Sequence, residues 1–275
     1  MSRELLDLAL TVAREAAALA GSRREGEVTV AATKSSDVDV VTEADRATER
    51  LIRERLSAAR PDDAFLGEEG DDVAGTTGVR WVIDPIDGTV NFLYGLPHYA
   101  VSIAAEQDGT VVAGVVLNIA TGTEYTAYVD PDGVTRSARD GAPIRVRETV
   151  PLGQRLVSTG FGYDARLREL QARALVHLVP RIRDIRRLAS CALDLCHVAE
   201  GTLDGYVEEG VNLWDHAAGG LVAQGAGAVV EVTTGAGGGR LVLCAPADGF
   251  AELRMLVADA GYLQEPAAEQ PLGET

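Results

Sequence analysis

The stretch that most restricts the possible folds is residues 81–92, which read WVIDPIDGTVNF. An apolar run typical of a buried strand leads directly into Asp84 and Asp87, and Pro85 stiffens the turn between them. Two carboxylates on one tight turn repel each other, and a fold tolerates this best when cations lie between them. Hard cations such as Mg²⁺ take oxygen ligands, and the carbonyl oxygen of Ile86 offers another one. The segment therefore favours a magnesium site at the end of a strand.

The same segment has the features of an anion site. Gly88 and Thr89 follow the second aspartate and are expected to open a helix, whose first backbone amides can bind an anion. Cations beside an anion cradle are what phosphoryl transfer requires. The alternative is structural: an ordinary Asp-Pro turn in which Asp87 caps the helix. Taken alone, residues 81–92 leave both interpretations open.

Two further segments can supply carboxylates. Residues 67–70 read GEEG, where Glu68 can bind a metal while Glu69 supports it from behind; the alternative is a solvated acidic loop. In residues 39–45, DVVTEAD, Thr42 and Asp45 fit a helix capping box. A functional role for Asp45 stays open, because a helix N-terminus can face a site.

Residues 204–219, DGYVEEGVNLWDHAAG, contain a third acidic group. Asp215 follows Trp214 where a loop leads into a predicted helix, so it is either a helix cap or a site residue. Trp214 fits packing better than chemistry. Glu208 lies at the end of a predicted strand, where a carboxylate can accept hydrogen bonds from substrate hydroxyls.

The order of elements predicts an α/β chain with two different halves. The first half is typical of helices on an antiparallel sheet, and the second half of alternating α/β units. We expect an α+β unit over 1–150, an α/β unit over 151–265 and a disordered tail over 266–275. The predicted helices cover 3–20, 42–59, 165–179, 190–200, a segment beginning near 214, and 250–260. The predicted strands cover 80–84, 99–105, 110–117, 123–129, 155–159, 182–186, 203–208, 228–232 and 241–244.

The charge balance excludes some classes of partner. The chain of 275 residues has 25 Lys+Arg against 42 Asp+Glu, a formal net charge of −17. Such a chain repels nucleic acid and anionic lipid unless it has a local basic patch, and no run of five Lys or Arg provides one. Three scattered cysteines, Cys191, Cys196 and Cys244, argue against a disulfide framework and suit a reducing, cytoplasmic setting.

The N-terminal residues 1–21 look superficially like a signal peptide. Glu4, Asp7, Arg14 and Glu15 interrupt them, so no apolar core of the required length survives. An amphipathic helix ending at Gly21 is the better interpretation. We find no candidate membrane span in the sequence.

Taken together, these segments resemble one family. The stretch from Lys34 to Asp45, GEEG, WVIDPIDGTVNF and LWDHAAG match the signatures of the inositol monophosphatase family. The resemblance covers nearly the whole chain, and the combination of WxxDPxDGT with a downstream WD is highly specific. It implies a layered αβαβα sandwich, usually dimeric, with lithium-sensitive, magnesium-dependent phosphatase activity in the cytoplasm.

The resemblance also implies roles at the matching positions, with two to three Mg²⁺ ions per site. Glu68, Asp84 and the Ile86 carbonyl would hold a first ion; Asp84, Asp87 and Asp215 would hold a second; a weaker third would share Glu68. Thr89, paired with Asp45, would orient the attacking water, with Glu69 and Lys34 behind the site. The substrate would contact Asp87, Gly88, Thr89, Cys191, Glu208 and Asp215, with the Gly88 and Thr89 amides on its phosphate.

The substrate is expected to be a small phosphorylated polyol, with inositol monophosphate first. One departure bears on this choice: the family often has a GSAA-like stretch where this chain has Ala189-Ser190-Cys191-Ala192, a region that contacts the organic part of the substrate. Histidinol-phosphate phosphatase, fructose-1,6-bisphosphatase and nucleotide 3′-phosphatase are alternatives of the same class. An alternative of another class is a non-catalytic partner-binding protein, since some family members also act with the transcription machinery.

Overall fold

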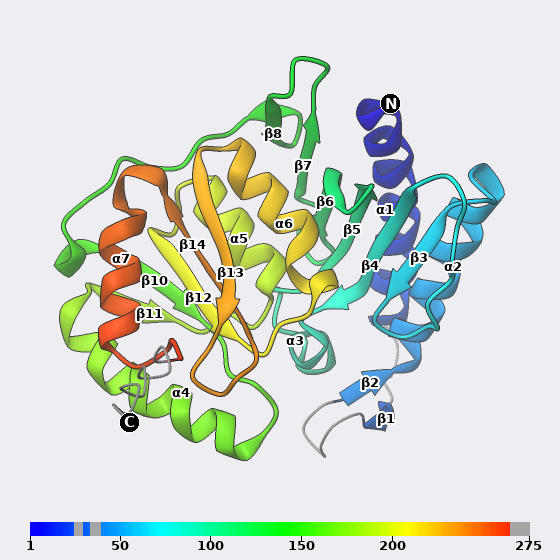
Figure 1. Ribbon diagram of the computed structural model, residues 1–275. Helices are drawn as coiled ribbons and strands as arrows, with labels where there is room; N and C mark the ends of the chain where they lie inside the picture. The colour runs from blue at the N-terminus through cyan, green and yellow to red at the C-terminus, as the bar shows by residue number, and fades with distance from the viewer. Residues whose placement is uncertain (25–29, 34–39, 265–275) are drawn as a thin grey trace, which may run out of the picture.

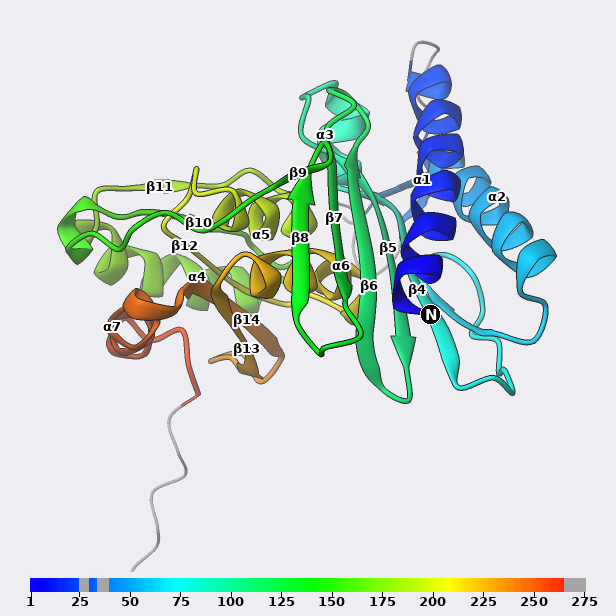
Figure 2. The same ribbon diagram turned by 90° about the horizontal axis from the view of Figure 1, so that it is seen from above.

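The computed structural model describes residues 1–24, 30–33 and 40–264, and its elements stack as five alternating layers of helices and sheets (Figure 1). Seen from above, the layers follow one another across the molecule (Figure 2). The outer helices are α1 (Ser2–Arg24) and α2 (Glu43–Ala59) on one side, and α4 (Ala165–Leu178) and α7 (Ala247–Asp259) on the other. Between the two sheets lie α5 (Cys191–Ala199) and α6 (Leu213–Gly225). The predicted αβαβα sandwich is confirmed.

The first sheet has seven strands in sequence order, and only the β3–β4 pair is parallel. Its strands are β3 (Ala64–Gly67), β4 (Val79–Asp87), β5 (Ala100–Gln107), β6 (Thr110–Asn118), β7 (Glu124–Val129), β8 (Thr135–Arg139) and β9 (Ala142–Pro143). A separate pair, β1 (Val30–Thr33) and β2 (Val40–Thr42), precedes α2, and the short helix α3 (Thr89–Tyr94) follows β4.

The second sheet has five strands in the order β11-β10-β12-β14-β13. They are β10 (Leu156–Thr159), β11 (Asp184–Arg186), β12 (Gly205–Glu209), β13 (Ala228–Thr234) and β14 (Arg240–Pro246), with short 3₁₀ turns at Leu152–Gln154 and Val179–Arg181. Pairs β10–β11 and β10–β12 are parallel, whereas β14 runs antiparallel to β12 and β13. The expected α/β half is thus a mixed sheet, because β13 and β14 form a hairpin without an intervening helix.

Strand β4 is buried on both faces, which explains its continuous apolar sequence. Trp81 and Ile83 point into the core beneath α1 and α2, while Val82 points into the core that contains α5 and α6. Successive side chains of a strand alternate between faces, so a strand between two layers needs apolar residues at every position. This places the polar end of β4, at Asp84, inside the molecule rather than at its surface.

Helix α6 approaches its neighbours closely because small residues line it. A Cβ atom on Gly219 would lie 2.8 Å from the carbonyl oxygen of Ala192 in α5. On the other side, a Cβ on Gly114 of β6 would lie 3.0 Å from the Cα of Ala218. The AAGG sequence at 217–220 therefore lets α6 fit between α5 and the seven-stranded sheet.

Several sequence expectations need correction. Helix α1 continues past Gly21 to Arg24, since a glycine near a helix end need not stop it when the helix still packs on the sheet. Strands β1, β2, β3, β8 and β9 were not predicted; each has five residues or fewer, too short to show a clear hydrophobic period. The three cysteines are free and buried. No helix within the described part of the chain is long and apolar enough to cross a membrane.

The close packing of α6 predicts opposite effects at two adjacent glycines. Gly219→Ala should lower the free energy of unfolding by about 1–3 kcal/mol, because the new methyl meets the backbone of α5. Gly220→Ala should raise it by about 0.5–1 kcal/mol, because its methyl meets only Val230 at 3.8 Å and alanine favours the helix. Urea unfolding of both variants measures this. Equal effects would show that α6 does not need the small residue at 219.

Candidate active site

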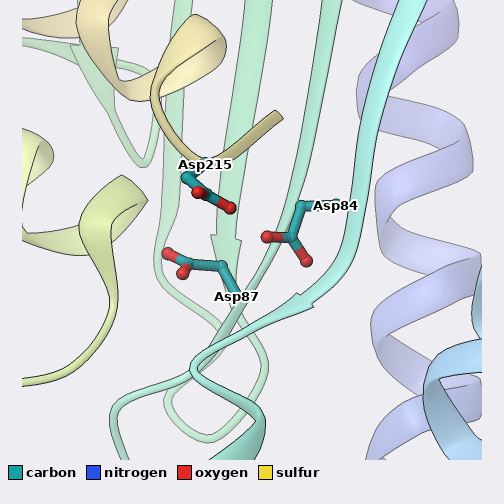
Figure 3. A group of neighbouring side chains, drawn as sticks. All are labelled: Asp84, Asp87 and Asp215. Atoms are coloured by element: carbon teal, nitrogen blue, oxygen red, sulfur yellow. The ribbon is translucent and has the colours of Figure 1, made fainter. Parts of the chain in front are cut away.

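Three aspartates meet where β4 ends and α6 begins. Asp84 and Asp87 come from β4, and Asp215 comes from the first turn of α6. One carboxylate oxygen from each lies within 4.8 Å of the others, and Figure 3 shows the three side chains gathered between β4 and the start of α6. The turn between the two strand aspartates makes this possible: Asp84 Oδ1 accepts a hydrogen bond from the Ile86 amide at 3.0 Å.

Asp87 is held by a helix distant in sequence. Its Oδ2 accepts hydrogen bonds from Ser190 Oγ at 2.6 Å and from the Ala192 amide at 2.7 Å, at the N-terminus of α5. Ser190 is also the N-cap of that helix. The positive end of a helix dipole favours a carboxylate there. Asp215 is fixed in a similar way, since its Oδ2 accepts from the Asn212 amide at 2.5 Å in a capping box.

The aspartates line a cavity of about 530 Å³, a volume that suits a small molecule. Most of the residues predicted for the site contribute to it: Glu68, Asp84, Ile86, Asp87, Gly88, Thr89, Cys191, Glu208 and Asp215. Asp45 and Glu69 are not part of its wall. Lys34 lies outside the described residues. The cavity walls thus come from both sheets and both inner helices.

Burial and nearby negative charges raise the pKa of all three aspartates. Desolvation is the larger cause for Asp84 and Asp215, followed by the charge of Glu68 and then of the neighbouring aspartates, and both pKa values are well above normal. The pKa of Asp87 is raised to about 7, again mainly by burial. A cation among these oxygens would favour the ionised forms. The donor set, oxygen atoms only, fits Mg²⁺.

Thr89 and Asp45 form a pair at the edge of the aspartate cluster. Thr89 Oγ1 lies 3.2 Å from Asp45 Oδ1 and 3.1 Å from the Ile86 carbonyl oxygen, and its hydroxyl can donate to either. Asp45 also closes the predicted capping box with Thr42 at the start of α2. The capping-box prediction is therefore confirmed, and the functional role of Asp45 stays a prediction. Burial, the largest cause, raises the pKa of Asp45 to about 6.

Glu68 and Glu69 face different surroundings, as expected for adjacent residues. Glu68 lines the cavity, and its charge raises the pKa of Asp84 and Asp215. Glu68 does not belong to the compact group formed by Asp84, Asp87 and Asp215. The Glu69 amide donates to the carboxylate of Glu49 at 2.7 Å, behind the cavity. No motif in the sequence indicated that Glu49 would contact this loop.

The side chains of Glu208 and Glu209 also point in different directions, because successive residues of a strand such as β12 face opposite sides of the sheet. Glu208 lines the cavity, accepts from the Tyr206 hydroxyl at 3.0 Å and has a pKa raised to about 7, chiefly by burial. Glu209 is 2% exposed and accepts from the amides of Gly237 and Gly239. These bonds hold the glycine-rich loop between β13 and β14.

The cavity wall includes Ala189 and Cys191, from the stretch that departs from the family pattern. Cys191 is buried, and desolvation keeps the pKa of its thiol well above normal, so it is a neutral wall residue. Ala189 has φ +68°, a conformation that favours glycine. Sequence reasoning missed Ser190, which holds Asp87, and Arg187, which is the one basic residue among the described residues that line the cavity.

Comparison with known proteins agrees with this geometry. The model of the inositol monophosphatase family matches residues 1–269. The chain is 47% identical over 264 residues to "Inositol-1-monophosphatase SuhB" of Mycobacterium tuberculosis, covering 90% of this chain and 91% of that protein. It is 37% identical over 237 residues to "Nus factor SuhB" of Pseudomonas aeruginosa, covering 84% and 86%.

The fold agrees with a solved structure as well. "Mycobacterium tuberculosis SuhB" superimposes with a TM-score of 0.81 at 42% identity, covering 96% of this chain and 99% of that chain. The family match, the sequence identity and the shared fold cover nearly the same residues. The chain therefore belongs to the inositol monophosphatase family and is a phosphoric monoester hydrolase.

Proposed function

We propose that this chain is a magnesium-dependent phosphatase whose preferred substrate is inositol monophosphate. The observation that carries the proposal is the convergence of Asp84, Asp87 and Asp215 within 4.8 Å, beside the hydrogen-bonded pair of Thr89 and Asp45. The names of the relatives, including inositol-1-monophosphatase at 47% identity, support the choice of substrate. The cavity volume of about 530 Å³ suits a small ring with one phosphate.

We assign the cation ligands by matching the site to the family pattern. Glu68, Asp84 and the Ile86 carbonyl would hold one Mg²⁺, Asp84, Asp87 and Asp215 a second, and Glu68 would share a weaker third. When bound, the ions polarise phosphate oxygens and lower the pKa of water. The donor oxygens and their raised pKa values fit this assignment.

The chain's own residues would prepare the nucleophile. When the Thr89 hydroxyl donates to Asp45 Oδ1, the lone pairs of Thr89 Oγ1 remain to accept a hydrogen bond from a water molecule. That bond would orient the water toward phosphorus. Its proton can pass to Thr89 Oγ1 as the hydroxyl proton moves to Asp45, whose pKa of about 6 lies in the useful range. The amides of Gly88 and Thr89 would meet the phosphate.

The experiment that tests this function is phosphate release from a panel of esters, with and without Mg²⁺. The panel contains inositol 1-phosphate, histidinol phosphate, fructose 1,6-bisphosphate and a nucleotide 3′-phosphate. We expect the highest kcat/KM on inositol 1-phosphate and no turnover in excess chelator, because the aspartates would then repel each other. Undiminished turnover in chelator would contradict the proposal.

Arg187 favours fructose 1,6-bisphosphate as a second candidate substrate. It is exposed and lines the cavity, and its charge lowers the pKa of Glu208 as a lesser effect. A guanidinium at this position can meet a second phosphate. A higher kcat/KM on the bisphosphate than on inositol 1-phosphate would favour this candidate.

The relative named Nus factor suggests a partner-binding role, yet every acidic ligand position is retained here.

Asp87→Asn should remove most catalysis and leave the fold intact. The substitution preserves volume and can keep an oxygen facing Ser190 and the Ala192 amide, while it deletes one ligand charge. We expect kcat to fall on the order of 10²-fold or more. The metal-free variant should be at least as stable as the wild type, because a buried like charge is gone. Near wild-type kcat would mean that the second cation site is misassigned.

Glu208→Gln should weaken recognition of polyol substrates selectively. Glu208 lines the cavity, and its carboxylate can accept two hydrogen bonds from neighbouring ring hydroxyls. The loss in kcat/KM on inositol 1-phosphate should be worth about 1.5–3 kcal/mol. p-Nitrophenyl phosphate, which has no hydroxyls to recognise, is the control and should be nearly unaffected. Equal losses on both esters would show that Glu208 acts on the cations or the fold.

A further inference from the structure

A buried carboxylate outside the cavity holds the loop that carries Glu68. Glu49 lies in α2 and is 2% exposed. Its Oε2 accepts from the Glu69 amide at 2.7 Å, and its Oε1 accepts from the Gly70 amide at 2.9 Å. Arg53, one turn later, donates from Nε to Oε1 at 2.7 Å. Hydrogen bonds to a charged group are stronger than neutral ones, so these contacts tie the loop to the helix.

The loop is shaped to fit around this carboxylate. A Cβ atom on Gly67 would lie 2.3 Å from Glu49 Oε1, and one on Gly70 would lie 2.8 Å from the same oxygen. Both glycines are therefore required by a close approach rather than by a turn. Arg53 extends the contact, because its Nη1 donates to the carbonyl oxygen of Asp71 at 3.0 Å.

The other side of the loop is attached to the strand that carries the aspartates. The Glu68 amide donates to the Ile83 carbonyl oxygen at 3.2 Å, continuing the parallel pairing of Gly67 with Ile83. Asp84 is the next residue of that strand. The backbone around Glu68 is thus held between β4 and Glu49, so that its side chain reaches the cavity beside Asp84.

We propose that Glu49 is a positioning residue for the metal centre. It fixes the backbone of residues 67–70 and thereby delivers the Glu68 carboxylate to the cation site. The need is electrostatic: the Glu68 carboxylate lines the same cavity as the carboxylates of Asp84 and Asp215, and a loosely held loop would let this like-charged group move away from them. A ligand held by its supporting contacts loses less freedom when the ion binds. The proposal rests on the proposed function, in which Glu68 is a ligand.

The test is Glu49→Gln, studied by binding of Mn²⁺ as the probe ion and by Mg²⁺ activation. Glutamine preserves volume but has only one acceptor oxygen for two loop amides and Arg53. We expect Mn²⁺ affinity, measured from the EPR signal of the free ion, to fall about 10–100-fold. The Mg²⁺ concentration for half-maximal phosphatase activity should rise by a similar factor. At saturating Mg²⁺, kcat should return to within a few-fold of the wild type.

Two further variants make the test specific. Glu54→Gln, at an exposed position on the same helix, is the matched control and should leave Mn²⁺ affinity unchanged. Gly70→Ala disturbs the same contact from the exposed loop, because its methyl would press on Glu49 and Arg53. It should weaken Mn²⁺ binding as Glu49→Gln does, and it decides the question if Glu49→Gln does not fold.

The outcomes separate this proposal from the proposed function. Wild-type Mn²⁺ affinity in Glu49→Gln and Gly70→Ala, with only a lower melting temperature, would show a purely structural role and overturn the inference. A wild-type protein that binds no Mn²⁺ would instead contradict the metal-dependent function itself, and the inference with it. A shifted Mg²⁺ midpoint with recovered kcat supports positioning, which a general loss of folded protein would not produce.

Discussion

The acidic cluster depends on how closely α6 packs against the seven-stranded sheet. Asp84 and Asp87 belong to β4, whereas Asp215 belongs to α6, so their mutual distance is a packing distance. Glycine at 114 and 219 lets the helix approach the sheet and α5. The hydroxyl of Ser102 on β5 then donates to the Trp214 carbonyl oxygen at 3.2 Å, at the start of α6. Any change in this layer would move the Asp215 carboxylate relative to those of Asp84 and Asp87.

The cost of gathering carboxylates is offset by backbone donors from several elements. Asp87 is bound by the N-terminus of α5, Asp215 by the Asn212 amide, and Asp84 by the turn that follows it. These donors stabilise negative charge, yet burial and repulsion still raise the three pKa values. The scaffold therefore holds the three carboxylates in place without supplying enough positive charge to neutralise them. A divalent cation would relieve that shortage, which links binding of the ion to the stability of the site.

Local sequence predicted the clustering of the acidic side chains better than the residues that hold them in place. Asp84 and Asp87 follow an apolar strand within one turn, so residues 81–92 alone place them together. Ser190 and Glu49 act across 103 and 20 positions of sequence, and no periodicity marks such contacts. The helices and most strands were predicted because their apolar patterns are long. The antiparallel direction of β14 beside β12 was not foreseen, since strand direction depends on tertiary packing.

The stretch around Ala189 joins the acidic cluster to another part of the cavity wall. Its φ of +68° costs a non-glycine residue roughly 1–2 kcal/mol, and such a conformation persists only where the surroundings impose it. Here they do: Asn91 binds the Leu188 carbonyl oxygen at 2.6 Å, and Asp87 binds Ser190 and the Ala192 amide. The wall that would face the organic part of the substrate is therefore shaped by the same aspartate that is assigned to the cation. A shift of Asp87 toward or away from an ion would be transmitted to that wall, because the two share hydrogen bonds rather than mere proximity.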